Sequence, residues 1–116
     1  MTCKVKYLIF IITILSVASC NVQKPLYNYA QYEDAVYHYI TVQDEKSEER
    51  LLKNYEKILE KMGARKMPPP GICADYGYLL LKKGETAKGK ALLEREKKLY
   101  PESTGFINAI LKRIEK

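Results

Sequence analysis

Apolar and polar side chains recur with a helical period along most of the chain, and the pattern breaks at glycines and prolines. Gly63, Gly84 and Pro101 are expected to end helices. No stretch alternates with the two-residue period of a strand, so the fold class is predicted to be all-α. The expected helices run over about 29–42, 48–62, 72–83, 86–99 and 104–116.

Residues 70–103 carry small and large residues at the spacing of a helix–turn–helix unit of about 34 residues. The segment therefore resembles one tetratricopeptide repeat. Glu96 departs from the pattern, because a small apolar residue is expected there. Residues 29–62 match the repeat less well, and 104–116 would cap the exposed face. The architecture expected is a tetratricopeptide-like stack of about five helices, made of two helix pairs and a C-terminal capping helix. The matching positions are Gly77, Leu80, Gly84, Gly89, Leu93 and Pro101.

The N-terminal segment has the pattern of an export signal. Two lysines precede an apolar run, Tyr7 to Leu15, which is too short to span a bilayer. Small and aliphatic residues then lead to a cysteine, as in a bacterial lipobox. This pattern predicts cleavage before Cys20, with lipid attached to the Cys20 sulfur and amine. The three lipobox positions before Cys20 are Val17, Ala18 and Ser19.

These features divide the chain into three parts. Residues 1–19 are expected to be a signal peptide, 20–28 a lipidated cysteine and tether, and 29–116 a helical domain. A transmembrane anchor is the competing interpretation, but it needs a longer apolar run and no cleavage site. The remaining length is enough for one small domain.

The formal net charge of the 116-residue chain is +6. Residues 70–116 hold the surplus of the expected mature chain, with ten basic and six acidic side chains. Such an excess suits an anionic lipid surface or an acidic partner, and falls short of a nucleic-acid footprint. The ordinary solvated face of two helices explains the same lysines.

Candidate catalytic chemistry is sparse. The chain has one histidine, His38, which makes neither a metal cluster nor a catalytic triad by itself. Cys3 would leave with the leader and Cys20 would be acylated, so Cys73 would be the single free thiol, placed at a core position. We therefore expect a non-enzymatic protein with no metal, no small-molecule substrate and no cofactor other than the lipid on Cys20.

Tyrosine is the residue type that most favours binding, because it offers a large contact area at low entropic cost. Five of the ten tyrosines lie between Tyr27 and Tyr39. Packing of the first helix onto the second is the alternative explanation, and it is favoured for most of them. The candidate protein-binding residues are Tyr29, Tyr32, Tyr39, Tyr76 and Tyr78.

Four motifs follow the lipobox: a tyrosine-rich segment over 29–39, Met-Pro-Pro-Pro-Gly over 67–71, Asp-Tyr-Gly-Tyr-Leu-Leu-Leu-Lys-Lys-Gly over 75–84, and Glu-Lys-Lys-Leu-Tyr-Pro-Glu-Ser over 96–103. Together they resemble a family of small bacterial lipoproteins known as domain of unknown function 4810. The resemblance implies an outer-membrane lipoprotein, commonly encoded beside a curli-secretion-channel-like lipoprotein, which suggests one envelope complex and a role as assembly factor or adaptor. It supplies no catalytic residues.

The leading hypothesis is a lipid-anchored, periplasm-facing accessory or assembly factor that binds other envelope proteins. Asn21 follows the predicted lipidated cysteine, and the absence of Asp there favours the outer membrane where enterobacteria-like sorting applies. The alternative is a structural envelope protein whose basic C-terminal half associates with anionic membrane lipid.

Overall fold

The computed structural model describes residues 2–17 and 23–116, and within these ranges the regular structure is helical throughout. The all-α prediction is confirmed, and the observed helices agree with the expected ones to within about three residues. A single 3₁₀ turn, Pro101–Ser103, separates the last two helices. The helices are α1 (Cys3–Val17), α2 (Tyr32–Val42), α3 (Glu45–Glu60), α4 (Ile72–Lys82), α5 (Thr86–Leu99) and α6 (Thr104–Ile114).

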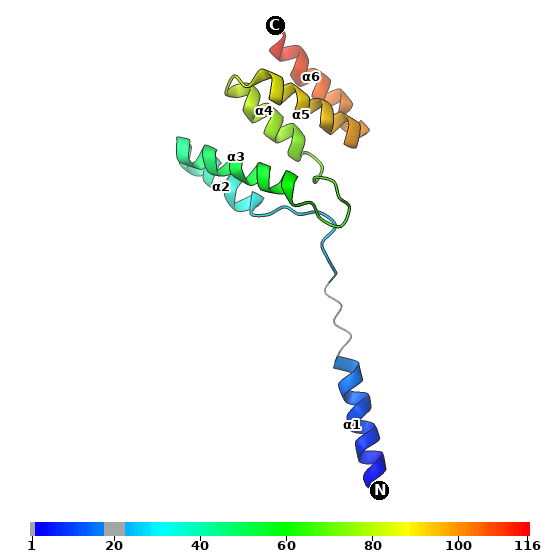
Figure 1. Cartoon of the computed structure of the whole chain (residues 1–116). Coiled ribbons are helices and arrows are strands. Elements are labelled where there is room, and N and C mark those ends of the chain that lie inside the picture. Colours follow the sequence, from blue (N-terminus) through cyan, green and yellow to red (C-terminus); the bar gives the residue numbers. More distant parts are fainter. Residues whose placement is uncertain (1, 18–22) are drawn as a thin grey trace.

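Helix α1 contains the apolar run of the N-terminal segment and lies apart from the other helices (Figure 1). It is 15 residues long. Among the described residues, no helix combines the length and the apolar character that are needed to cross a membrane.

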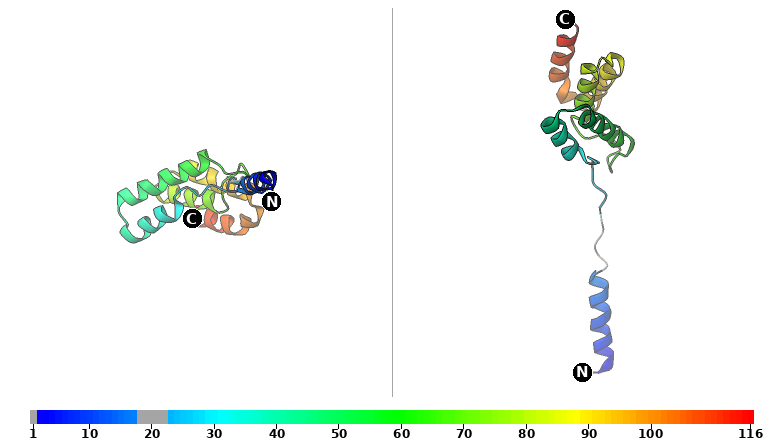
Figure 2. Two further views of the ribbon diagram at one scale, coloured as in Figure 1. Left: turned by 90° about the horizontal axis from the view of Figure 1, so that it is seen from below. Right: turned by 90° about the vertical axis from the view of Figure 1, so that its left-hand side faces the viewer.

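Helices α2 and α3 form the first antiparallel pair (Figures 1 and 2). The turn between them is sharp because Gln43 adopts a left-handed conformation and Asp44 then caps α3. The Asp44 carboxylate accepts a hydrogen bond from the Ser47 backbone N–H at 2.7 Å, and the Ser47 hydroxyl oxygen accepts one from the Asp44 backbone N–H. An ion pair between Arg50 and Asp34 joins the two helices.

Helix α2 begins at Tyr32, three residues later than expected. The Asn28 side chain accepts a hydrogen bond from the Ala30 backbone N–H at 2.9 Å, and Ala30 has a φ of 47°. Residues 28–30 therefore form a turn, which uses the backbone that would otherwise start the helix.

Helices α4 and α5 form the second pair, and they approach closely at two glycines. A Cβ atom built on Gly77 would lie 2.8 Å from the carbonyl oxygen of Gly89, and one built on Gly89 would lie 2.8 Å from that of Gly77. Gly84 makes the turn between the helices with a φ of 87°. The repeat pattern expects glycine or another small residue at all three positions; close packing explains Gly77 and Gly89, and the left-handed backbone explains Gly84.

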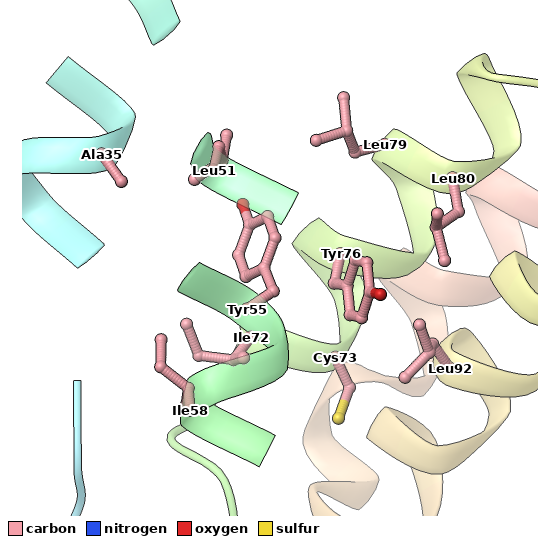
Figure 3. Packing of buried hydrophobic residues seen from close by; sticks show 10 residues of the cluster. All are labelled: Ala35, Leu51, Tyr55, Ile58, Ile72, Cys73, Tyr76, Leu79, Leu80 and Leu92. Carbon is pink, nitrogen blue, oxygen red and sulfur yellow. The ribbon is translucent and has the colours of Figure 1, made fainter. Parts of the chain in front are cut away.

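The main core lies between the two helix pairs (Figure 3). Tyr55 of α3 and Tyr76 of α4 stack with ring centroids 5.2 Å apart. A smaller core of Ala74, Leu93 and Ile107 packs α6 onto the second pair. The two helix pairs contact each other over a short stretch of α3 and α4. Stacked side chains, rather than closely approaching helix backbones, therefore hold the two pairs together. The residues of the main core are Ala35, Leu51, Tyr55, Ile58, Ile72, Cys73, Tyr76, Leu79, Leu80 and Leu92.

Glu96, the residue that departs from the repeat pattern, is 2% exposed. Its Oε1 atom accepts a hydrogen bond from the Gly71 backbone N–H at 2.7 Å, at the start of α4. The Tyr100 hydroxyl donates to the Pro68 carbonyl oxygen at 2.7 Å. Helix α5 and its cap thus hold the proline-rich connector through two polar contacts. A small apolar residue at position 96 would leave the Gly71 N–H without this partner.

Gly63 does not serve as the helix cap that the sequence predicted. Helix α3 ends at Glu60 with Lys61 as its cap, and Gly63 is not among the glycines with positive φ. A Cβ atom at Gly63 would instead lie 2.5 Å from the carbonyl oxygen of Leu26. The glycine is needed because residues 25–28 pack against the loop after α3. Residues 25–28, within the segment expected to be a tether, are therefore packed onto the domain.

Candidate functional site

Helix α4 exposes one narrow face while the rest of it is buried. Asp75, Tyr78 and Lys82 follow one another at intervals of three and four residues, which places them on the same side of the helix. The opposite side carries the core residues Cys73 and Leu80. The exposed face of α4 thus forms a ridge between its neighbours α2 and α6.

A hollow lies on each side of this ridge, and both hollows are lined by Asp75, Tyr78 and Lys82. The first, of about 460 Å³, separates α4 from α6, and the second, of about 220 Å³, separates α4 from α2 and α3. We call the two hollows and the ridge together the central groove. Its other lining residues are Ala74, Leu81, Phe106, Ile110, Arg113 and Ile114 on the α6 side, and Tyr32, Val36, Tyr39, Ile40, Leu51, Tyr55 and Leu79 on the α2 side.

A hydrogen bond crosses the groove between α2 and α4. The Tyr32 hydroxyl donates to the Asp75 carboxylate at 2.7 Å. Burial, together with this bond to a carboxylate, raises the pKa of Tyr32 to about 12. Tyr32 therefore stays neutral at physiological pH and holds the Asp75 carboxylate in place.

Two cations line the α6 side of the groove without an ion-pair partner among the described residues. Lys82 and Arg113 both line the hollow between α4 and α6, and neither forms an ion pair with any residue in the described ranges. The apolar wall beside them includes Phe106, which is 66% exposed. This combination of exposed apolar surface and unpaired positive charge suits a protein segment with an apolar face and acidic side chains.

Three of the five candidate tyrosines line the groove, namely Tyr32, Tyr39 and Tyr78. Tyr29 is exposed but lies outside it, edge-to-face with Tyr27 at 6.4 Å. The structure therefore brings three of the candidates together in the groove, and protein binding by them stays a prediction.

Tyr76 is the candidate whose placement was wrong, because it is 2% exposed in the core. Residues two positions apart in an α-helix are separated by about 200° around its axis. Tyr76 and Tyr78 therefore point to nearly opposite sides of α4. The Tyr76 hydroxyl donates to the Glu56 carboxylate at 3.1 Å and accepts from the Lys88 ammonium at 3.0 Å. Tyr76 joins α3, α4 and α5 rather than presenting a surface.

Helix α6 contributes a part of the groove that the sequence prediction did not include. Phe106, Ile110 and Ile114 recur every four residues, whereas the buried Ile107 lies on another side of the helix. A helix that carries apolar residues on two sides has one side left over after it packs as a cap. This second apolar side of the helix was the feature of the sequence that could have identified the α6 part of the groove.

A family described as "Domain of unknown function (DUF4810)" matches residues 26–110. The chain belongs to this family. The match begins within the strap of residues 25–28, which packs against the loop after α3, and extends through most of α6. No curated protein and no solved structure matches the chain.

Most residues of the predicted lipidation site lie outside the described part of this DUF4810 protein. Ala18, Ser19 and Cys20 lie outside the described residues, and Val17 is the last residue of α1. Cleavage before Cys20 and lipid attachment to it therefore remain predictions.

The polar residues considered for chemistry are placed as follows. His38 lies on the surface of α2, 3.8 Å from the Asp34 carboxylate. Cys73 is fully buried, and burial raises the pKa of its thiol to about 11, so it is unreactive at neutral pH. Within residues 2–17 and 23–116, no group of three or more His, Cys, Asp or Glu side chains is placed to hold a metal ion.

Proposed function

We propose that this DUF4810 protein is a lipoprotein, anchored to the outer membrane through Cys20 and facing the periplasm, that acts as a non-enzymatic protein-binding accessory or assembly factor in a cell-envelope complex. The observation that carries the proposal is the central groove, a polar-edged apolar surface over α2, α4 and α6. Its size and character suit a segment of another protein better than a small molecule, because it is open and spread over three helices.

The helix arrangement supports a tetratricopeptide-like interpretation of the groove. The Gly77–Gly89 approach, the turn at Gly84 and the two successive helix pairs agree with the repeat pattern in the sequence. In such stacks the first helix of each pair lines a shared surface. Here α2, α4 and α6 hold the corresponding positions, and these helices line the central groove.

The basic second half gives less support to the alternative, a structural protein that lies on anionic lipid. Several of its lysines are paired with carboxylates of neighbouring residues: Lys83 with Glu48, Lys88 with Glu56, Lys90 with Glu115 and Lys97 with Glu94. These pairs leave less free positive charge than the sequence count indicates. They favour the protein-binding proposal.

Site-specific photo-crosslinking in the native envelope tests the binding proposal. A photoreactive phenylalanine replaces Tyr78 or Phe106 in the groove, and Tyr37 serves as the matched control, since it is exposed on α2 but does not line the groove. We expect both groove positions to form an adduct with the curli-secretion-channel-like lipoprotein and position 37 to form none. Equal adducts from all three positions, or none from the groove in a folded protein, would contradict the proposal.

The anchor has a separate test. Changing Cys20 to Ser should abolish labelling with radioactive palmitate and leave the unprocessed precursor. Normal processing of that variant would refute lipid attachment at Cys20 without bearing on the groove.

A further inference from the structure

Residues 25–28, which we call the strap, are fixed to the loop that follows α3 (Figure 1). The Ala64 and Arg65 backbone N–H groups donate to the carbonyl oxygens of Pro25 and Leu26 at 2.9 and 3.1 Å. The Asn28 side-chain amide donates to the Lys61 carbonyl oxygen at 2.6 Å. The strap is thus part of the folded domain, so the segment that could act as a tether ends before Pro25 rather than at residue 28.

The strap also binds through Tyr27. The Arg65 guanidinium donates to the Tyr27 hydroxyl at 2.9 Å and lies 5.4 Å from the centre of its ring. The neighbouring Tyr100 hydroxyl and the Arg65 guanidinium lower the pKa of Tyr27, while burial and the charge of Glu102 oppose them. Residues from three separate parts of the chain therefore meet at the strap.

Four cations belong to this region, one directly before the strap and three in the segment after α3 to which the strap is bonded. Lys24, Lys61, Arg65 and Lys66 are all exposed, and none of them forms an ion pair with a residue in the described ranges. Two acidic groups oppose this charge: Glu60 ends α3 directly before the loop, and Glu102 acts on the Tyr27 hydroxyl. The local balance is therefore positive.

An exposed apolar side chain lies among these cations. Leu26 is 59% exposed, although its carbonyl oxygen is bonded to the loop. We call Lys24, Leu26, Lys61, Arg65 and Lys66 the strap patch. Cations around an exposed leucine suit the boundary between lipid headgroups and acyl chains, where both kinds of side chain find favourable contacts.

The chain length between the lipid and the strap limits how far the patch can lie from the membrane. Pro25 follows Cys20 by five residue steps. An extended chain spans about 3.3–3.6 Å per step, or about 17–18 Å in all. Lipid attached to Cys20 would therefore place the strap patch close to the headgroups. This step rests on the anchor of the proposed function.

We propose that the strap patch docks onto anionic phospholipid headgroups with Leu26 at the interface, and so fixes the orientation of the domain. The C-terminal end of helix α6 lies at the end of the body away from the strap (Figures 1 and 2). Docking by the strap patch points this end, with the α6 side of the groove, toward the periplasm. The lipid-facing surface is thus in the first half of the domain rather than in the basic second half.

Tryptophan reporters test this orientation, because the native chain contains no tryptophan. Leu26→Trp places a reporter in the patch, and Tyr37→Trp places the matched control at an exposed site on α2. The mature lipidated proteins are reconstituted into phosphatidylcholine vesicles with and without phosphatidylglycerol, with brominated acyl chains as quenchers. We expect stronger quenching at position 26 than at position 37, and a further increase at position 26 with phosphatidylglycerol.

Charge removal separates docking from anchoring. Each of Lys24→Gln, Lys61→Gln and Lys66→Gln should lower the ratio of docked to undocked protein about fivefold, since one cation near an anionic surface contributes about that factor. Acyl labelling should not change. Equal quenching at positions 26 and 37 in a lipidated protein would overturn the docking inference alone. A protein without acyl label would overturn the anchor and this inference with it, while adducts in the groove would still test protein binding independently.

Discussion

The contact between Gly77 and Gly89 gives the sharpest test of the helix packing. We expect Gly77→Ala to destabilise the domain, although alanine is the better helix former. A Cβ atom at position 77 would lie 2.8 Å from the Gly89 carbonyl oxygen, 3.1 Å from Leu92 Cβ and 3.2 Å from Leu93 Cγ. The first of these atoms is backbone and the second is a Cβ, so rotamer changes cannot relieve the contact. Helices α4 and α5 must move apart.

Two opposing terms set the size of the effect. Replacing glycine by alanine inside a helix contributes about 1 kcal/mol of stability. Forcing an extra methyl group into a packed interior costs about 1–3 kcal/mol, and the upper part of that range applies because the obstacle is backbone. The net loss should be about 1–2 kcal/mol, which lowers the Tm of a domain of this size by about 5–15 °C.

Gly105→Ala is the matched control, since Gly105 lies in α6, has no positive φ, and would carry a Cβ atom with no neighbouring atom within 4 Å. It should raise the Tm by a few degrees, through about 0.5 kcal/mol of helix propensity. Thermal and urea unfolding followed by far-ultraviolet circular dichroism measure both variants. If Gly77→Ala stabilises the protein as Gly105→Ala does, the close approach of α4 and α5 is wrong.

Three further changes probe the connector, the core and the strap. Glu96→Ala leaves the half-buried Gly71 N–H without its acceptor, and urea unfolding should show a loss of about 1–3 kcal/mol. Glu96→Gln keeps an acceptor oxygen and should lose less. Equal stability of the Ala variant and the wild type would contradict the connector contact. Burial raises the pKa of Cys73 to about 11, so at pH 8 roughly a thousandth of this thiol is ionised, and iodoacetamide should label it slowly until urea unfolds the protein. Rapid labelling of the native protein at pH 8 would show that the thiol is not buried. Gly63→Ala places a Cβ atom 2.5 Å from the Leu26 carbonyl oxygen and should release the strap. Hydrogen exchange at the Ala64 and Arg65 amides should then become faster, because these amides donate to the strap. Unchanged exchange rates at these two amides would rule out the strap contact.

The sequence located much of the candidate site but not its shape. Tyr32, Tyr39 and Tyr78 were candidate protein-binding residues, and they line the central groove. Tyr76 was assigned with them because tyrosine type and position along the chain cannot distinguish two sides of a helix whose partners are unknown. The α6 wall, including Phe106, was treated as a cap because a single helix does not reveal which of its two apolar sides is covered.

The chain by itself determined the helices, because local patterns control where helices begin and end. Asp44 and Ser47 cap α3, Gly84 makes the turn after α4, and Pro101 stops α5. Periodicity and capping depend on neighbours in the sequence, so they can be recognised without a fold. The tertiary structure decided what depends on residues far apart in the chain. Gly63 is needed for the strap rather than for a helix end, and Glu96 is needed for Gly71, 25 residues away. These roles arise only when the helix pairs pack together, which no local pattern specifies.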